Sequence, residues 1–236
     1  LDFSKAHHFV MAYDWNINEK LHLKIEPYFQ YLFNIPVIKN STESLINLQN
    51  DWFINDTYAN NGKGKNYGLD LTLEQYINNG FYYLLSGSIF NSEYKTDTNI
   101  WYNTRFNKNY LLNTLVGKEF RIGKKRQSLL GINLKLSLQG GDRYSKIDPT
   151  ASFMEQDVVY NETTPFTEQS KTSIISHFTI NYEWYKKKST QKLSLKILNA
   201  TNYKDFQGHR YNINTNKVEE FREALMIPNI SYKISF

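Results

Sequence analysis

His177 is the residue best placed for catalysis by type and spacing, because Ser173 precedes it by four positions and Asn181 follows it by four. On a β-strand this spacing puts all three side chains on one face. It also holds each partner more than about 10 Å from the histidine, which is too far for a hydrogen bond within the strand. A catalytic triad would therefore need partners from neighbouring strands. A histidine that is hydrogen-bonded among polar neighbours is the simpler interpretation.

Metal binding is the other chemistry to consider. His7 and His8 are adjacent, so on a strand they point to opposite faces and cannot share one ion. Asp142 and Asp148 could contribute to a calcium site, but two carboxylates fall short of the roughly 6–8 oxygens that Ca²⁺ needs. We therefore expect no metal site and no cofactor.

The elements that carry these residues read as long β-strands. In residues 21–32 apolar side chains alternate with polar ones for the whole segment, and residues 128–139 repeat the pattern. Strands of roughly 10–16 residues are long enough to cross a bilayer when tilted. About nine such segments occur, near residues 7–17, 21–32, 66–76, 81–94, 108–120, 128–139, 170–185, 192–200 and 222–236.

The connections between these segments alternate in length. Short turns lie at 18–20, 77–80, 121–127 and 186–191, and long ones span 33–65, 95–107, 140–169 and 201–221. Bacterial outer-membrane barrels have short periplasmic turns and long extracellular loops. They also carry aromatic girdles, and aromatic residues gather next to the short turns here: Tyr13, Trp15, Phe81, Tyr83, Phe120, Tyr182, Trp184, Tyr232 and Phe236.

Composition supports this fold. Aromatic residues make up 16% of the 236-residue chain, yet the mean hydropathy is −0.59. No apolar run approaches the ~18 residues of a spanning helix. Cysteine is absent, and the basic clusters at 124–126 and 186–188 fall in turns, which does not favour nucleic-acid binding. We predict an all-β fold, an antiparallel transmembrane β-barrel segment of about nine long strands, in the bacterial outer membrane.

Strand parity gives a further expectation. Nine strands with a periplasmic C-terminus would place the N-terminus outside, whereas single-chain bacterial barrels have an even strand count. We therefore expect residues 1–236 to be the C-terminal part of an outer-membrane barrel, with further strands upstream. A soluble sandwich is the alternative fold, and it rarely keeps such long unbroken apolar rows.

Three short motifs resemble those of TonB-dependent receptors, particularly the Bacteroidetes type. The first is the alternating C-terminus, with Ile230, Tyr232, Ile234 and Phe236, which is similar to the signature that the barrel-assembly machinery recognises in outer-membrane barrels. The others are Gly140-Gly141-Asp142-Arg143-Tyr144 with Ile147-Asp148, and Asn199-Ala200-Thr201-Asn202 before the last loop and strand. Asp142 and Lys146 depart from the family pattern, which has a basic residue and a proline there.

This resemblance implies active uptake of a scarce nutrient such as a siderophore or glycan, without a chemical reaction. Its implied partners are outer-membrane lipid, the TonB system acting through a plug domain upstream, the assembly machinery, and in some members a surface lipoprotein. Ligand contacts would come from the long loops, where aromatic rings stack on ligand rings and arginines pair with anions. The candidates are Trp52, Phe53, Trp101, Tyr102, Arg105, Arg143, Tyr144, His209 and Arg210.

Two other functions stay open. A passive porin-like or adhesive barrel would show the same strands without a plug. A lipid-acting barrel enzyme would need a His, a Ser and an acid or amide within hydrogen-bond reach on adjacent strands.

Overall fold

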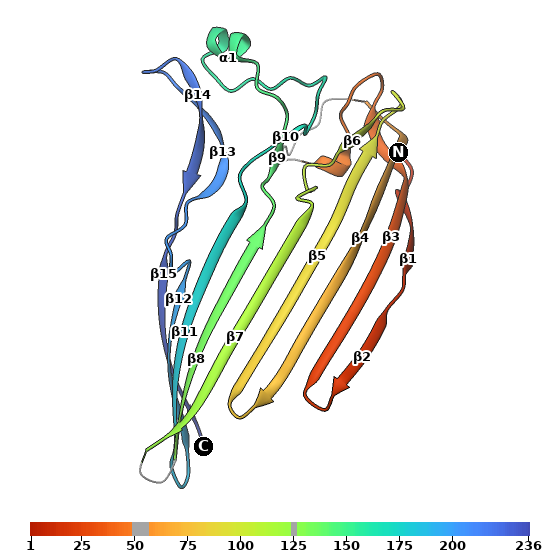
Figure 1. Ribbon diagram of the computed structural model, residues 1–236. Coiled ribbons are helices and arrows are strands. Elements are labelled where there is room, and N and C mark those ends of the chain that lie inside the picture. The colour runs from red at the N-terminus through yellow and green to blue at the C-terminus, as the bar shows by residue number, and fades with distance from the viewer. Residues whose placement is uncertain (49–56, 124–126) are drawn as a thin grey trace.

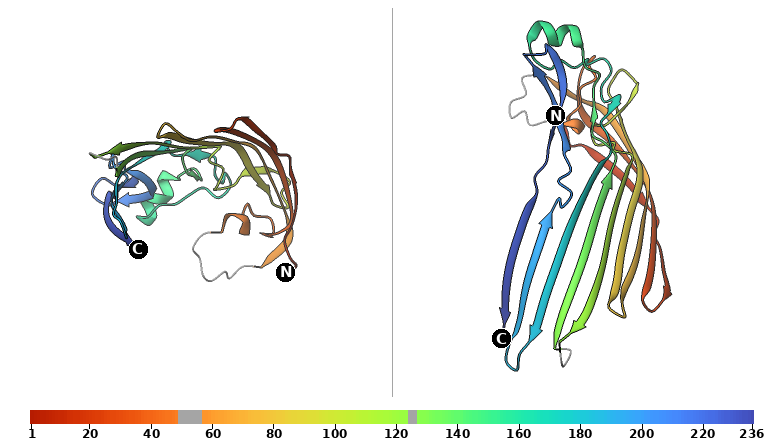
Figure 2. Two further views of the ribbon diagram at one scale, coloured as in Figure 1. Left: turned by 90° about the horizontal axis from the view of Figure 1, so that it is seen from below. Right: turned by 60° about the vertical axis from the view of Figure 1, so that its left-hand side comes forward.

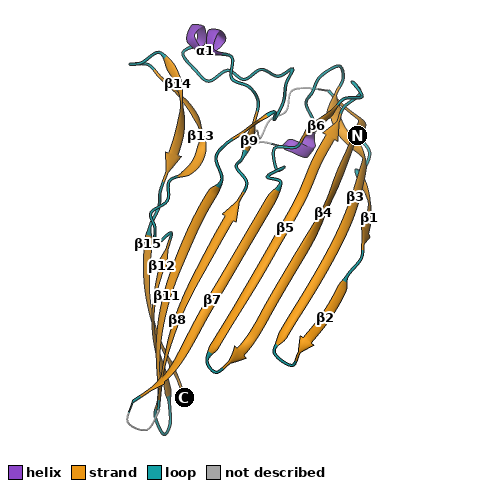
Figure 3. Cartoon of the chain, in the orientation of Figure 1, coloured by secondary structure: helices purple, strands orange, loops and turns teal. Residues whose placement is uncertain are grey.

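The computed structural model describes residues 1–48, 57–123 and 127–236, and it is almost entirely antiparallel β-structure (Figures 1 and 3). Its main sheet has 11 strands in the order β1-β3-β4-β5-β7-β8-β11-β12-β15, with β2 beside β3 and β6 beside β5. This edge-to-edge path confirms the predicted fold class and the estimate of about nine long strands. Within the described residues the sheet does not close on itself.

The strands of the main sheet are β1 (Lys5–Val10), β2 (Tyr13–Asn18), β3 (Leu21–Ile38), β4 (Tyr58–Asn78), β5 (Phe81–Lys95), β6 (Trp101–Asn103), β7 (Tyr110–Ile122), β8 (Ser128–Gln139), β11 (Ser173–Tyr185), β12 (Thr190–Leu198) and β15 (Ile227–Ser235). The loops carry η1 (Leu45–Asn47), α1 (Pro149–Glu155), the pair β9 (Arg143–Tyr144) and β10 (Glu168–Gln169), and the hairpin of β13 (Asp205–Asn212) and β14 (Lys217–Glu223). No helix in the described ranges is both long and apolar enough to cross a membrane.

Short turns and long loops lie at opposite ends of the sheet, as predicted (Figure 1). Three predicted boundaries were wrong. The strands β3 and β4 extend into the predicted 33–65 loop, and the predicted 222–236 strand begins only at Ile227 because residues up to Glu223 belong to the β13–β14 hairpin. The predicted 7–17 strand is interrupted at Met11 and Ala12, opposite Pro27, which has no N–H to offer the ladder.

The sheet is an arc with a concave and a convex face (Figure 2). The register fixes which residues share each face. One row runs His22, Glu74, Leu84, Leu115, Lys135 and His177, and the next row toward the loops on the same face contains Lys24, Thr72, Ser86, Asn113 and Ser137. The loop residue Ile46 lies against this face beside Gly64, and the loops fill the inside of the arc at one end (Figure 2). The mainly polar face is therefore the concave one.

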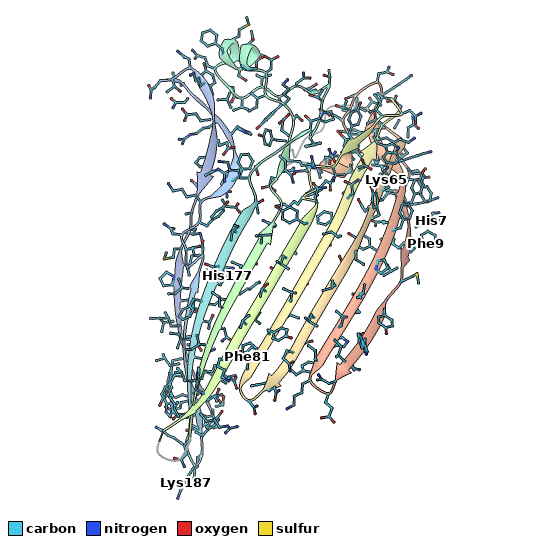
Figure 4. The ribbon with its side chains drawn as sticks, viewed as in Figure 1. His7, Phe9, Lys65, Phe81, His177 and Lys187 are labelled. Atoms are coloured by element: carbon cyan, nitrogen blue, oxygen red, sulfur yellow. The ribbon has the colours of Figure 1, made fainter. Side chains whose placement is uncertain are left out.

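Away from the loop end, the convex face carries the apolar half of most strands. Leu134 is 51% exposed and Ile230 is 74% exposed, although both stand in the middle of long strands. Toward the short turns this face is rich in exposed rings, and Trp184 stacks between Tyr182 and Tyr232 at centroid distances of 5.2 and 6.2 Å. Figure 4 shows Phe81 at this end of the sheet. The alternation predicted from the sequence therefore separates two faces of opposite polarity.

A small packed core lies on the concave face where β3 and β4 approach the loops. The register of β3 shifts after Phe33, beside Asn34 in a left-handed conformation, and the shift turns Ile35 and Val37 into the interior. The glycines opposite, Gly62 and Gly64, leave the space that these side chains fill. Because of this β-bulge, the end of β3 turns apolar side chains toward the interior, where they pack against the first long loop.

Gly117 offers a test of concave-face packing. The ring of Tyr82 lies over this glycine, 2.2 Å from where a Cβ would stand, and its hydroxyl donates to the Asn133 Oδ1. We expect Gly117→Ala to displace the ring and to lower the free energy of unfolding by about 1–3 kcal/mol. Gly87→Ala is the matched control, because its nearest neighbour would be 3.5 Å away. Denaturant midpoints measure both variants, and equal midpoints would contradict this packing.

Candidate functional site

A pocket of about 820 Å³ opens on the concave side at the loop end of the sheet. Residues from all four long connections line it, together with the end of β5. They include Thr42, Glu43, Asn47, Tyr94, Arg105, Asp142, Arg143, Tyr144, Glu155, Tyr160, Glu162, Phe166 and Phe206. This is the type of concave, mixed polar and aromatic surface that binds small molecules.

Asn107 joins the walls of this pocket. Its side chain is fully buried, and its Nδ2 donates to the Oδ1 atoms of Asn91 (2.6 Å) and Asn103 (2.8 Å). Its backbone carbonyl accepts from the Arg143 Nε at 2.7 Å, and Arg143 Nη2 also donates to the Asn109 Oδ1 at 2.7 Å. One side chain and one backbone carbonyl thus connect β5, the 96–109 loop and β9.

Two glycines let the third loop run against its neighbours. A Cβ on Gly140 would lie 1.7 Å from the Lys108 carbonyl oxygen, and one on Gly141 would lie 1.8 Å from the Ser170 carbonyl oxygen. Both obstacles are backbone atoms, so no side-chain movement could relieve the clash. The Gly-Gly pair that the sequence analysis identified is therefore a structural requirement of the loop.

The β13–β14 hairpin packs on this loop through aromatic rings. Tyr144 makes an edge contact with His209 at 4.5 Å and lies 5.9 Å from Phe206, and the Tyr160 hydroxyl is 3.1 Å from the His209 Nδ1. The register of β13 shifts between Phe206 and Gly208. Gly208 adopts a φ of 138°, which favours glycine. The hairpin is thus held by ring contacts rather than by the main sheet.

The charges around the pocket are mixed. Arg105 and Arg143 lie among Glu43, Asp142, Glu155 and Glu162. Burial lowers the pKa of Arg143, which still remains charged at neutral pH. Asp142 binds the Lys108 ammonium at 2.7 Å. Among the described residues, the Arg105 guanidinium donates one hydrogen bond, of 3.3 Å to the Leu48 carbonyl, so most of its donors stay unpaired there.

The structure separates the nine predicted ligand residues. Arg105, Arg143 and Tyr144 line the pocket, Tyr102 lies beside it with its ring 5.7 Å from that of Tyr94, and His209 packs behind Tyr144. Trp101 lies on the convex face, because neighbouring residues of β6 alternate. Arg210 points to the other side of its hairpin, over the Phe221 ring at 5.4 Å. Trp52 and Phe53 lie outside the described residues.

Sequence reasoning missed five of the rings in the pocket wall: Tyr58, Tyr94, Tyr160, Phe166 and Phe206. Tyr94 could have been found, since it ends a predicted strand on the polar face. It is 1% exposed, and its hydroxyl donates to the Thr42 carbonyl at 2.8 Å. The other four belong to the predicted long connections, whose course no periodicity describes.

The residues first considered for catalysis and metal binding have other partners. His177 Nδ1 accepts from the Asn199 backbone N–H at 3.4 Å. His177 lies on the concave face, where its cross-strand neighbour on β8 is Lys135. Asp148 caps α1 by accepting from the N–H groups of Thr150 and Ala151, both at 2.9 Å. His8 bonds to Gln30 on the concave face while His7 packs on Phe33 on the convex one.

The site thus combines aromatic rings, amide and hydroxyl groups and the guanidinium of Arg105 around an open cavity. Such a set can stack on ring systems and hydrogen-bond polar substituents.

Comparison with solved structures gives a likeness over the whole chain. The fold is similar to that of the ferric yersiniabactin uptake receptor FyuA from Yersinia pestis, with a TM-score of 0.63 and 12% sequence identity. The match covers 99% of this chain and 30% of that receptor, so the chain spans under a third of its length. No protein-family model and no curated protein matches the sequence. At this identity the likeness concerns the fold alone.

His209 makes the packing of the hairpin depend on pH. Burial lowers the pKa of His209 below its ordinary value of 6.5, although Glu220 opposes this shift. The unfolded hairpin therefore binds a proton more readily, so stability present above about pH 6.5 is lost as the pH falls through the lowered pKa. We expect proteolytic cleavage within β13–β14 to become faster as the pH is lowered from 7 to 5. The His209→Phe variant, digested under the same conditions, should show a smaller increase in the cleavage rate. Equal acceleration in both proteins would refute this role.

Proposed function

We propose that this chain forms part of an outer-membrane β-barrel that takes up a scarce nutrient. The observation that carries the proposal is the polarity of the sheet: long strands with an exposed apolar convex face and a polar concave face. An exposed apolar face is stable in contact with lipid. Strands can span a bilayer when each backbone N–H and C=O group is hydrogen-bonded to a neighbouring strand. The exposed rings near the short turns, such as Tyr182 and Tyr232, suit a membrane interface.

This placement gives the molecule a direction. Short turns face the periplasm in bacterial barrels, so the loop end with its pocket would face outside. A ligand arriving from the medium would then meet Arg105, Tyr144 and Tyr160 before it reached the polar concave wall. The uptake receptor that shares the fold supports a transport role for such a barrel.

The finer proposal is TonB-dependent uptake, and it rests on the three sequence motifs. Two of them build the loop end: Gly140-Gly141 permits close backbone packing, and Asn199 ends β12 by bonding both backbone groups of Tyr203 at 2.9 Å. The third, with Ile230, Tyr232, Ile234 and Phe236, would meet the barrel-assembly machinery from the convex face of β15. The TonB system and a surface lipoprotein are partners on the same resemblance.

The membrane placement predicts opposite outcomes at two neighbouring positions. Leu134→Arg puts a charge on the convex face and should cost about 2–4 kcal/mol if the residue lies near the bilayer midplane. Asn133→Arg is the control, because Asn133 lies on the concave face, paired with Gly117 and Thr179. Unfolding of the protein from lipid vesicles measures both. A larger loss at residue 133 would show that the faces are assigned the wrong way round.

Growth distinguishes active uptake from a passive pore. We expect deletion of the gene to abolish growth on one limiting ferric siderophore or glycan, and the same defect to follow removal of TonB. Reduced growth that does not depend on TonB would instead indicate a passive barrel.

The nutrient identified by growth then tests the pocket. Arg105→Gln should lower its affinity, measured on isolated outer membranes, by about tenfold, since a charge-assisted hydrogen bond contributes roughly 1.5–3 kcal/mol. Arg210→Gln is the matched control on the far side of the hairpin. If both variants bind equally well, the ligand lies elsewhere.

A further inference from the structure

A row of basic residues crosses the convex face at the loop end, outside the pocket. The register places Lys5, Phe33, Lys63, Lys95 and Trp101 opposite one another on β1, β3, β4, β5 and β6. The next row toward the short turns adds His7, Tyr31, Lys65 and Glu93. We call Lys5, His7, Lys63, Lys65, Lys95 and Trp101 the convex-face cluster. Figure 4 shows Lys65 and His7 near each other at this end.

The charge of this cluster is only partly neutralised. Glu93 binds the Lys65 ammonium at 2.8 Å, and Lys95 donates to the Asn99 Oδ1 at 2.6 Å. Lys5 and Lys63 are exposed and make no ion pair with any residue in the described ranges. Lys63 and Lys95 face each other directly across β4 and β5, an arrangement that destabilises a sheet unless an anion lies between the charges.

A groove of about 520 Å³ lies beside these lysines. His7, Tyr31, Phe33, Asn34, Asn60, Asn61, Gly62 and Lys63 line it. Its floor is aromatic, with His7 5.1 Å and Tyr31 6.3 Å from the Phe33 ring. Asn60 holds the rim by donating to the carbonyls of Asn34 (2.8 Å) and Asp2 (2.9 Å). The cluster therefore adjoins a shaped recess rather than a flat surface.

The neighbouring surface identifies what kind of ligand fits. Directly below the two basic rows, toward the short turns, the convex face exposes Phe9, Phe29, Tyr67 and Ile89. A ligand that fills the groove would therefore contact apolar protein surface on one side and lysine ammonium groups on the other. The Lys65 ammonium lies 4.3 Å from the centroid of the Trp101 ring. This contact keeps the ammonium at the boundary between the basic rows and the apolar surface.

We propose that the convex-face cluster binds the phosphorylated headgroup of an outer-leaflet glycolipid. The lysines pair with phosphate, the asparagines and rings of the groove contact the sugar, and the acyl chains lie on the apolar band below. Basic pockets on other membrane proteins bind anionic lipid headgroups through the same charge pairing. The proposal rests on the outer-membrane placement proposed above, which puts this face in the outer leaflet.

The test uses the purified protein in zwitterionic detergent, titrated with bisphosphorylated lipid A, dephosphorylated lipid A and inorganic phosphate. We expect tight binding of the first alone. Lys63→Gln should weaken it about fivefold, the contribution of one lysine near an anionic lipid surface. Lys135→Gln, an exposed lysine of the concave face, should leave the affinity unchanged. Removing Lys63 also relieves its repulsion with Lys95, so unfolding cannot account for a loss.

Each other result overturns the proposal. Equal affinity for dephosphorylated lipid A would exclude phosphate recognition, and equal binding of inorganic phosphate would show a free-anion site instead of a lipid site. Unchanged affinity in Lys63→Gln would exclude the cluster. Insertion into phosphatidylcholine vesicles is measured separately: protein that inserts without preferring lipid A refutes this inference alone, whereas failure to insert refutes the membrane placement itself.

Discussion

The two-residue period of the antiparallel strands is the constraint from which the other features follow. Each register pair fixes a residue on one face of the sheet, and the same assignment then propagates from β1 to β15. A slip of one residue would move Leu134 to the concave face and Lys135 to the convex one. The polar wall, the apolar band and the basic rows above it are therefore products of a single continuous hydrogen-bonded ladder.

Departures from that ladder occur where the loops must be shaped. The bulge after Phe33 turns Ile35 and Val37 inward to hold the first loop and leaves Asn34 and Asn60 at the rim of the convex groove. The second bulge, at Gly208, lets the β13–β14 hairpin bend against Tyr144. Regular pairing builds the wall, and these two bulges position the surfaces that could meet ligands.

The sequence was sufficient for the wall because long alternation is a strong signal. It predicted the faces of β3 and β8, the ends at which turns and loops lie, and the aromatic rows near the turns. It could not predict that Trp101 and Tyr102 separate, since β6 has three residues and pairs through a neighbouring strand. It also missed the β13–β14 hairpin, whose short strands lie between turn residues. Tyr160 and Phe206 reach the pocket only through contacts distant in sequence.

The Asn107 junction has a consequence for how the pocket would respond to a ligand. Three segments are already joined there by hydrogen bonds and by the glycine contacts at 140 and 141, so most of their conformational entropy is lost during folding. A bound ligand would therefore need little additional free energy to order that side of the pocket, as in other preorganised sites. The opposite side is held by the rings of Tyr144, Phe206 and His209 and by the 3.1 Å contact of the Tyr160 hydroxyl with His209. Ligands of different size would thus be accommodated by movement of the aromatic side, while the Asn107 side keeps its shape.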